Sequence, residues 1–224
     1  MRDTPLLTAG TPLAGYLPLR TRFDKADWYV DTLHVDMARR MVEQYHYAKG
    51  ASPNGVYLHG LFLHGDYRTC YGVAWWLPAM AGTVARYNPG GNRTTLTLHR
   101  LVIHPLVPTN GASYLMGRSI RRIEQEGRYE MLVTYADTWR GHTGAIYKAT
   151  NWHYEGLSEP LPVWVNADGQ PQSKRNGLAG KNHRTPTDME TNGCVMIGQY
   201  AKHVYTMRLK TKQQAAQLSL WGAA

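Results

Sequence analysis

The chain has 224 residues, is 43% hydrophobic and carries a formal net charge of +9, from 25 Lys and Arg against 16 Asp and Glu. This length and apolar content suffice for one domain with a real core, and no apolar run approaches the length of a membrane span. Residues 1–20 lack the basic start and apolar block of a secretory signal, so we expect a cytoplasmic protein. The positive charge favours a polyanionic partner, with nucleic acid the leading class.

Cysteine and aromatic usage narrow the class further. Cys70 and Cys194 show no C-x-x-C spacing, so the sequence predicts neither a disulfide framework nor a cysteine-based zinc site. Fifteen Tyr and seven Trp stand against two Phe, which favours rings with a polar group and suits a wet, stacking surface. Tyrosines packed in the core would account for the same numbers.

The start of the chain predicts an arm followed by a helix. Residues 1–23 are rich in Pro, Gly and Leu without periodicity and are interpreted as an extended arm, and residues 24–224 as a single domain. Apolar spacing predicts an amphipathic helix over 36–49, whose last turn holds His46 and Tyr47. These two are either surface residues at a helix end or a titratable imidazole placed beside a phenol.

Strands are predicted where short apolar or β-branched runs lie between turn residues. These runs are 55–64, 69–77, 94–103, 131–135, 162–165, 194–197 and 203–209. The first two predict a hairpin. It ends at Trp75 and Trp76, of which one could stack on a base, while core packing is the alternative use. Arg100 interrupts the apolar half of its strand, so it either pairs with an acid or faces a ligand.

Two further helices each follow a strand. One opens at 109–113 and stops at Gly127, and its free N-terminal amides could hold an anion. The other starts near Thr143, after a polar loop that begins at Asp137, and carries Tyr147. The element order predicts an α+β fold with a central mixed, mostly antiparallel sheet flanked by helices. The sequence contains no P-loop and no G-x-G-x-x-G motif.

A polar, basic and Gly-rich insertion spans 166–193 and is too long for a simple connection. It is either disordered or a binding loop that orders on a polyanion. Its candidate phosphate contacts are Lys174, Arg175, Lys181 and Arg184.

Residues 145–156 resemble a motif of the GNAT N-acyltransferase fold, in which a small residue, an aliphatic residue and Tyr precede an aromatic residue and Gly. The matching residues are Ala145-Ile146-Tyr147, Trp152 and Gly156. The resemblance implies that Tyr147 is a general acid for a departing coenzyme A sulfur, or that it only holds its helix.

The pyrophosphate loop departs from the GNAT pattern of Arg or Gln, Gly, x, Gly, x, Gly or Ala. The first four places hold residues 108–111, Pro-Thr-Asn-Gly, and the last holds Ser113. The helix start at Gly111, Ala112 and Ser113 could still receive phosphates. Dependence on an acyl-CoA donor does not follow from the fold alone.

A narrower resemblance covers most of the chain. The segments that carry it are Tyr45-His46-Tyr47, Leu98-His99-Arg100-Leu101, Ala112-Ser113-Tyr114-Leu115 and Tyr135–Gly156. They are similar to the phage Mom family of DNA-modification proteins, which have a GNAT-like fold. That family adds a carbamoylmethyl group to the exocyclic amine of adenine in DNA and shields phage DNA from host restriction. The resemblance implies double-stranded DNA as partner and the host cytoplasm as location.

The same resemblance implies two sets of site residues. The catalytic set is His46, Tyr47, Asp137, Tyr147 and Asn151, and the cofactor-binding set is Arg100, Gly111, Ala112 and Ser113. Because an exocyclic adenine amine is a poor nucleophile, the site must take a proton and position the base tightly, with Asp137 or His46 as the base. The target must flip out of the duplex, and the rings that could hold it are Tyr47, Trp75, Trp139 and Trp152.

The donor is unknown, because simple acyl transfer cannot join nitrogen through a methylene. An acyl-CoA-related donor would need an extra step. Iron held by His46, Tyr47 and Asp137 is an alternative to acid–base chemistry. Two other functions stay open, an ordinary acyl-CoA-dependent N-acetyltransferase for a protein or small amine and a catalytically silent DNA-binding protein. A homodimer also stays open.

Overall fold

The computed structural model describes residues 22–52, 55–66, 68–172 and 185–210. Its elements in chain order are η1 (Lys25–Asp27), β1 (Trp28–Thr32), α1 (Val35–Tyr45), β2 (Tyr57–Leu63), β3 (Gly72–Pro78), α2 (Ala81–Tyr87), β4 (Thr95–Ile103), α3 (Gly111–Glu126), β5 (Met131–Asp137), η2 (Thr138–Arg140), α4 (Ala145–Ala149), β6 (His153–Leu157), β7 (Leu161–Val165), β8 (Pro171–Gln172), α5 (Pro186–Thr191), β9 (Val195–Tyr200) and β10 (Lys202–Arg208). Among the described residues, no helix is long and apolar enough to cross a membrane.

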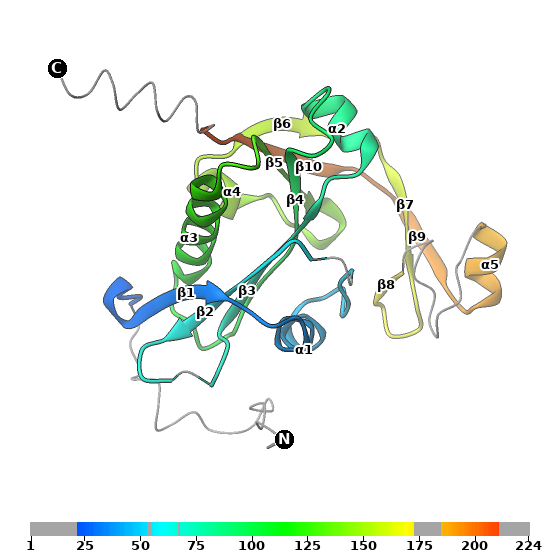
Figure 1. Ribbon diagram of the computed structural model, residues 1–224. Coiled ribbons are helices and arrows are strands. Elements are labelled where there is room, and N and C mark those ends of the chain that lie inside the picture. The colour runs from blue at the N-terminus through cyan, green and yellow to red at the C-terminus, as the bar shows by residue number, and fades with distance from the viewer. Residues whose placement is uncertain (1–21, 53–54, 67, 173–184, 211–224) are drawn as a thin grey trace.

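Seven strands form the main sheet, in the order β1-β2-β3-β4-β5-β10-β6 (Figure 1). Its neighbouring strands are antiparallel except for the parallel pair β4 and β5. The chain leaves this sheet after β6 and returns at β10, and between them it builds a second sheet of order β8-β7-β9. The predicted α+β class with a mixed, mostly antiparallel sheet is therefore confirmed.

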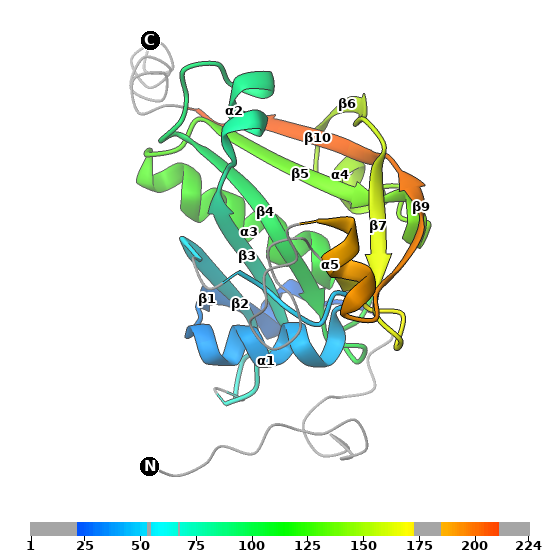
Figure 2. The same ribbon diagram turned by 90° about the vertical axis from the view of Figure 1, so that its right-hand side faces the viewer.

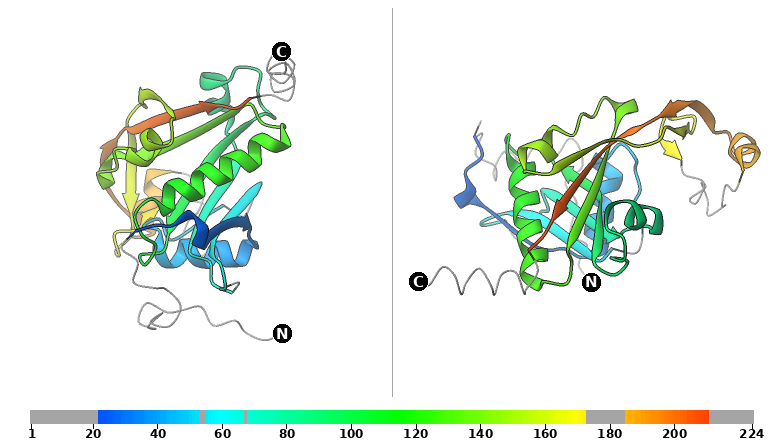
Figure 3. Two further views of the ribbon diagram at one scale, coloured as in Figure 1. Left: turned by 90° about the vertical axis from the view of Figure 1, so that its left-hand side faces the viewer. Right: turned by 90° about the horizontal axis from the view of Figure 1, so that it is seen from above.

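Helices cover both faces of the main sheet. α3 lies along one face (Figure 3, left), where its buried residues pack against Trp76 of β3, and α1 covers the opposite face against Trp75 (Figure 2). Since successive strand residues point to opposite faces, both tryptophans are fully buried. Trp152 is also buried and stacks on Trp76, with ring centroids 6.4 Å apart. The expectation that Trp75 or Trp152 holds a flipped base is therefore wrong, because both rings belong to the core.

The first helix ends earlier than its apolar spacing predicts. α1 stops at Tyr45, and His46 has extended backbone angles (φ −96°, ψ 136°). The His46 ring accepts a hydrogen bond from the Ala48 N–H (3.1 Å), which stabilises a turn in place of another helical turn. His46 and Tyr47 therefore lie beyond the helix rather than in its last turn, and their side chains are carried by a loop.

The insertion predicted over 166–193 contains secondary structure in its described parts, namely β8 and α5. A capping box starts α5, in which the Thr185 hydroxyl accepts from the Asp188 N–H (3.1 Å) and the Asp188 carboxylate accepts from the Thr185 N–H (2.8 Å). Met189 of α5 packs with Trp164 and Cys194 in a small apolar cluster. The small sheet and its helix extend from one side of the main sheet (Figure 1).

Some sequence predictions lie outside the described residues. These are the arm over 1–21 and the candidate phosphate contacts Lys174, Arg175, Lys181 and Arg184. Phe23, at the end of the predicted arm, is buried and stacks on Trp28 with ring centroids 5.5 Å apart. Two short elements, β1 and α2, were not predicted.

The centre of the sheet opens where β4 and β5 diverge. Their parallel pairing is limited to Thr95–Thr97 against Met131–Val133, so the later halves of both strands are not joined. In β4, the pairing with β3 runs from Trp75↔Arg100 to Trp76↔Leu98 and leaves His99 as an extra, bulged residue. A bulge changes the direction of the side chains around it. Here His99 and Arg100 both line the opening beside β5.

Candidate active site

A cavity of about 1080 Å³ lies at the divergence of β4 and β5. It is bounded by the loop after α1, the end of β3, the start of α2, the middle of β4, the end of β5, the loop before α4, α4 itself and the start of β10. Its volume matches the upper end of the range of about 300–1,000 Å³ common for ligand pockets. The polar and ionic side chains in its lining are His46, Tyr47, Ser52, Thr83, Thr97, His99, Arg100, Tyr135, Asp137, His142, Thr143, Tyr147 and Lys202.

Asp137, the last residue of β5, is at the centre of a cluster of polar side chains. Its Oδ2 accepts a hydrogen bond from the Tyr47 hydroxyl. Its Oδ1 lies 2.7 Å from Lys202 Nζ in an ion pair and has no other polar partner among the described residues. Burial alone would raise the pKa of Asp137, but the Lys202 ammonium and the Tyr47 hydrogen bond outweigh burial and lower it. Asp137 is therefore ionised at neutral pH.

His46 is a neutral side chain at the edge of this cluster. Burial and the Arg100 guanidinium lower its pKa to about 3, against a smaller opposing effect of Asp137. Its Nδ1 accepts from the Ala48 N–H, so the ring proton belongs on Nε2. Both nitrogens are then committed, one as an acceptor to the backbone and one as a donor. Of the two candidate bases, this arrangement leaves Asp137.

Arg100 carries its charge into the cavity without an acid beside it. Its Nε donates to the Gly50 carbonyl (2.9 Å) and its Nη1 to the His99 carbonyl (2.8 Å). In the part of the chain that the structure describes, no carboxylate lies within ion-pair distance of it. Of the two roles predicted from the sequence, facing a ligand fits this geometry. An anionic or carbonyl oxygen is the matching ligand chemistry.

Aromatic rings gather around Tyr47 at the cavity. The Trp139 ring meets the Tyr47 ring edge-on at 6.1 Å between centroids, and the His142 ring does so at 5.5 Å. The Arg140 guanidinium lies 4.2 Å from the Trp139 ring centroid and 5.2 Å from that of Tyr47. His46 also stacks on the Tyr47 ring, with ring centroids 4.3 Å apart, so a planar ligand could stack here in place of one of these neighbours.

Tyr147 reaches the cavity from α4. Its ring is 9% exposed and packs against Trp152 and Tyr205 in the core on the α3 side of the sheet. Because β4 and β5 are apart at this level, the residue still lines the cavity. Burial raises the pKa of Tyr147, against a smaller opposing effect of a hydrogen bond with Thr134, so its hydroxyl keeps its proton. A protonated phenol in this place can act as an acid.

Four of the predicted catalytic and cofactor-binding residues do not line this cavity, and neither does Trp139, which contacts the Tyr47 ring. Asn151 follows α4 with a positive φ of 63° and is exposed. Gly111, Ala112 and Ser113 form the first turn of α3, and Ser113 contributes to a separate depression of about 480 Å³ with Arg118 and Arg121. The structure thus brings together His46, Tyr47, Arg100, Asp137 and Tyr147, whose roles stay predictions, and leaves the other four apart from them.

The three residues considered as iron ligands do not fit a cation in this arrangement. The Tyr47 hydroxyl donates to Asp137, the other Asp137 oxygen pairs with an ammonium, and His46 Nδ1 accepts from the backbone. A metal-bound histidine commonly donates its second ring N–H to an acceptor, which a backbone N–H is not. Lys202 and Arg100 add two positive charges nearby. No His, Cys, Asp or Glu cluster suited to a metal occurs among the described residues.

Several lining or neighbouring residues were not among the predicted site residues, and Lys202, His142 and Arg140 are three of them. Lys202 is opposite Asp137 in the β5–β10 pairing, His142 follows η2, and Arg140 stacks on Trp139. The sequence shows Lys202 only as one of several cations near the end of the chain. Its contact with Asp137 depends on the pairing of strands far apart in the sequence, which leaves no local signal.

Solved structures of N-acetyltransferases resemble the chain at low sequence identity. The ribosomal-protein-S18-alanine N-acetyltransferase of Escherichia coli has a TM-score of 0.48 and 10% identity, over 82% of this chain and 95% of its own. An N-acetyltransferase of Staphylococcus aureus Mu50 has a TM-score of 0.46 and 12% identity, over 82% of this chain and 99% of its own. A GNAT family acetyltransferase of Elizabethkingia anophelis, with acetyl-CoA bound, has a TM-score of 0.45 and 12% identity, over 83% of this chain and 100% of its own.

The sequence comparisons give a family for the chain. No curated protein matches it. A family model described as the Mom protein family matches residues 27–220, which include every cavity-lining residue named above. The chain therefore belongs to the Mom protein family.

Proposed function

We propose that this protein is a DNA-modifying transferase that attaches a carbamoylmethyl group to the exocyclic amine of adenine in double-stranded DNA. The observation that carries the proposal is the family match over residues 27–220 together with the ionised Asp137 beside a group of aromatic rings in one cavity. The modified base would protect phage DNA from host restriction. The +9 charge of the chain supports a polyanionic substrate.

Asp137 is suited to the proton transfer that alkylation of an amine requires. The lone pair of an exocyclic adenine amine is delocalised into the ring, so the free amine reacts poorly. As the new N–C bond forms and the bond from carbon to the leaving group breaks, the nitrogen becomes cationic and its proton becomes acidic. A carboxylate with a lowered pKa can accept that proton, and before reaction it can accept a hydrogen bond from the amine and position it.

The rings near Tyr47 are suited to hold a base outside the duplex. An enzyme acting on a base inside a duplex must extrude it, and stacking on aromatic side chains offsets part of the lost stacking energy. Tyr47 lines the cavity and is half-buried, and the half-buried Trp139 ring lies against it, whereas Trp75 and Trp152 are buried in the core. Because His46 stacks on Tyr47 and the Arg140 guanidinium lies over both rings, a flipped base would take the place of one of these neighbours.

Arg100 and Tyr147 are suited to the donor side of the reaction. The unpaired guanidinium could bind a carbonyl or anionic oxygen of the donor, and the protonated phenol could protonate a leaving group. An acyl-CoA-related donor would fit these two groups, with phosphates received at the start of α3. Attachment through a methylene still requires an additional step beyond acyl transfer.

The test is to express the protein in cells and digest their DNA to nucleosides for mass spectrometry. We expect a deoxyadenosine heavier by one carbamoylmethyl group with the natural chain, and about 10²-fold less of it or lower with Asp137→Asn. Asp168→Asn is the matched control, because Asp168 lies exposed in the turn between β7 and β8. Only ordinary nucleosides from well-expressed, folded protein would overturn the proposal.

An ordinary amine acetyltransferase is the second candidate, favoured by Tyr147 at the divergence of β4 and β5. It predicts release of free thiol from acetyl-CoA in the presence of an amine, with unmodified DNA. Tyr147→Phe should lower that release by about 10²-fold or more if the phenol is the general acid. DNA binding that survives both Asp137→Asn and Tyr147→Phe, without any chemistry by the natural chain, would indicate a catalytically silent binding protein.

A further inference from the structure

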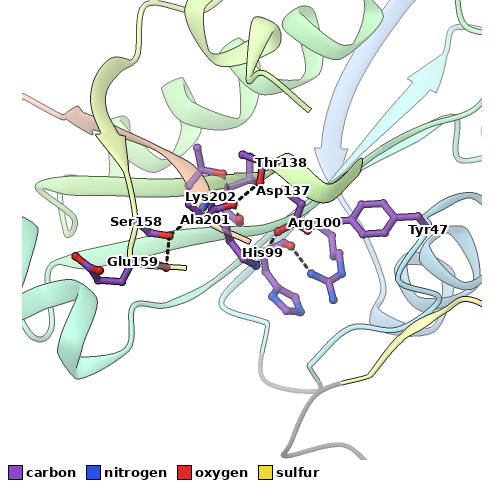
Figure 4. Close-up of polar contacts among 11 residues, drawn as sticks. Tyr47, His99, Arg100, Asp137, Thr138, Ser158, Glu159, Ala201 and Lys202 are labelled. Atoms are coloured by element: carbon purple, nitrogen blue, oxygen red, sulfur yellow. Dashed lines mark hydrogen bonds and ion pairs between the residues drawn. The ribbon is translucent and has the colours of Figure 1, made fainter. Parts of the chain in front are cut away.

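Lys202 is fixed at the junction of the two sheets. It is the first residue of β10, two residues after β9 ends, and its register partner in β5 is Asp137. Two hydrogen bonds join this point to Ser158, which follows β6. The Lys202 N–H donates to Ser158 Oγ (3.0 Å), and the Ser158 N–H donates to the Lys202 carbonyl (2.9 Å). From the other side, Thr138 Oγ1 donates to the Ala201 carbonyl (2.6 Å) (Figure 4).

These hydrogen bonds fix the Lys202 backbone and therefore the face of the sheet on which its side chain lies. Residues directly opposite in an antiparallel pair have their side chains on the same face, so the ammonium meets the Asp137 carboxylate across the two strands. The two Asp137 oxygens then have different partners, Lys202 on Oδ1 and Tyr47 on Oδ2. Without the ammonium, Oδ1 would be buried without a polar partner among the described residues.

We propose that Lys202 is a positioning residue, whose ammonium holds the Asp137 carboxylate in the rotamer that turns Oδ2 toward Tyr47 and the cavity. The inference rests on the proposed function, since it takes Asp137 as the group that meets the amine. The charged and titratable groups around Asp137 come from several elements, namely His46 and Tyr47 after α1, Arg100 of β4, His142 before α4, Tyr147 of α4 and Lys202 of β10. Of these, Lys202 is the one in ion-pair contact.

Two other uses of Lys202 compete with this one. Its side chain is 39% exposed, so it could contact a DNA phosphate instead, and the ion pair could serve stability alone. The three uses differ in what a neutral side chain of similar length should change. A positioning role affects turnover of bound DNA, a phosphate contact affects the dissociation constant and its salt dependence, and a stability role affects only unfolding.

The experiment compares Lys202→Met and Lys202→Arg with the natural chain. The measurements are single-turnover formation of the modified adenosine on saturating duplex DNA, the dissociation constant by fluorescence anisotropy, and the melting temperature. We expect Lys202→Met to slow turnover by about 10- to 100-fold, as small misplacements of catalytic groups do, with the dissociation constant within about twofold. Lys202→Arg should recover most of the rate. Lys148→Met is the control, since Lys148 is exposed on α4 and lies over Tyr154.

A double-mutant comparison separates positioning from other effects. In an Asp137→Asn background, Lys202→Met should slow any residual turnover no further, because the carboxylate it positions is gone. An equal additional loss in that background overturns the proposal, as does normal turnover with salt-dependent weakening of DNA binding.

Failure of the proposed function is distinguishable from failure of this inference. If the natural chain forms no modified adenosine, the proposed function is wrong, and the contact is then tested without substrate. The ¹³C chemical shift of the Asp137 side-chain carboxylate, assigned with Asp137→Asn, should differ between the natural chain and Lys202→Met at one neutral pH. An identical shift would overturn the assigned contact.

Discussion

Three histidines, the buried His59 and the half-buried His46 and His99, are neutral in the folded protein. Burial is the main cause that lowers the pKa of His46 and His99 to about 3 and that of His59 to about 4. A backbone N–H donates to a ring nitrogen of His46 and of His99, and Ser119 Oγ lies 2.7 Å from His59 Nδ1. These imidazoles therefore act as hydrogen-bonding groups at neutral pH, and His46 and His99 add no charge to the cavity.

Replacing His59 with Gln should make the fold less sensitive to acid. The unfolded chain takes up a proton at His59 near pH 6.5, whereas in the folded protein burial and the Arg122 guanidinium delay this to about pH 4. Between these values the unfolded state binds more protons, so stability falls as the pH falls. The contribution of His59 over the whole window is at most about 3 kcal/mol. Urea unfolding at pH 7 and at pH 5 measures how much the free energy of unfolding changes between the two pH values.

His64→Gln is the matched control, because His64 is an exposed residue of the same hairpin. The difference in unfolding free energy between pH 7 and pH 5 should shrink in His59→Gln and stay unchanged in His64→Gln. The same change in both variants would contradict the assignment to the buried histidine.

At the scale of elements, strand β4 separates what a sequence pattern predicts from what pairing decides. The interruption of its apolar half by Arg100 is visible in the sequence, and it predicts a cation that meets an acid or a ligand. The bulge at His99 arises from the register with β3, and the opening beside Arg100 arises where β4 and β5 cease to pair. Neither leaves a local pattern, so the cavity itself could not be predicted.

The entry into α4 depends on Gly144, and replacing it should damage the site. Gly144 precedes the helix with a φ of +73°, and a Cβ there would lie 2.3 Å from the Tyr205 ring. Gly144→Ala therefore combines backbone strain with a steric clash. We expect a loss of about 1–3 kcal/mol in the free energy of unfolding and a lower rate of DNA modification, because Tyr147 follows within α4. Urea unfolding and nucleoside analysis measure the two effects.

Gly117→Ala is the matched control for this prediction. Gly117 lies within α3, where an added Cβ meets no atom within 4 Å. Alanine is the better helix former, so this change should stabilise the protein by up to about 1 kcal/mol. Equal stability changes in the two variants would contradict the assigned role of Gly144.

At the scale of the molecule, strands that contain an apolar run were predictable and the shortest elements of the insertion were not. Apolar runs predicted β2, β3, β4, β5, β7, β9 and β10, and capping residues predicted α3. The two-residue β8 and six-residue α5 are too short for a periodic signal, and they are stabilised by contact with Trp164 and its neighbours. The insertion over 166–193 therefore has the sequence of a polar loop, although its described parts contribute strand β8 to the small sheet and form helix α5.

The site residues show the same contrast between local sequence signals and contacts that only the folded chain makes. A strand end predicted Asp137, and a motif predicted Tyr147, because both signals lie within a few residues. His46 and Tyr47 were recognised by type, but the loop that carries them beyond α1 was not. Lys202 was missed as a partner of Asp137, since only the assembled sheet brings β10 beside β5.

The net charge of +9 predicts salt-dependent DNA binding, and the sequence assigns much of it to four cations between β8 and α5. Replacing Lys174, Arg175, Lys181 and Arg184 together with Ser should weaken binding to any duplex. Each lost phosphate contact should lower the slope of log K against log salt by about 0.9, so a loss of about 3–4 in slope is expected if all four contact phosphates. Anisotropy titrations over a salt series measure the slope.

A second quadruple variant distinguishes these cations from positive charge in general. Arg22, Lys25, Arg118 and Arg121 line a depression along α3, on the sheet face opposite α1, and their replacement with Ser removes the same charge. If residues 174–184 contact the DNA phosphates, the α3 variant should keep the natural slope within about one. Equal slopes in the two variants would mean that DNA binding responds to net charge alone, and the assignment of the phosphate contacts to residues 174–184 would be wrong.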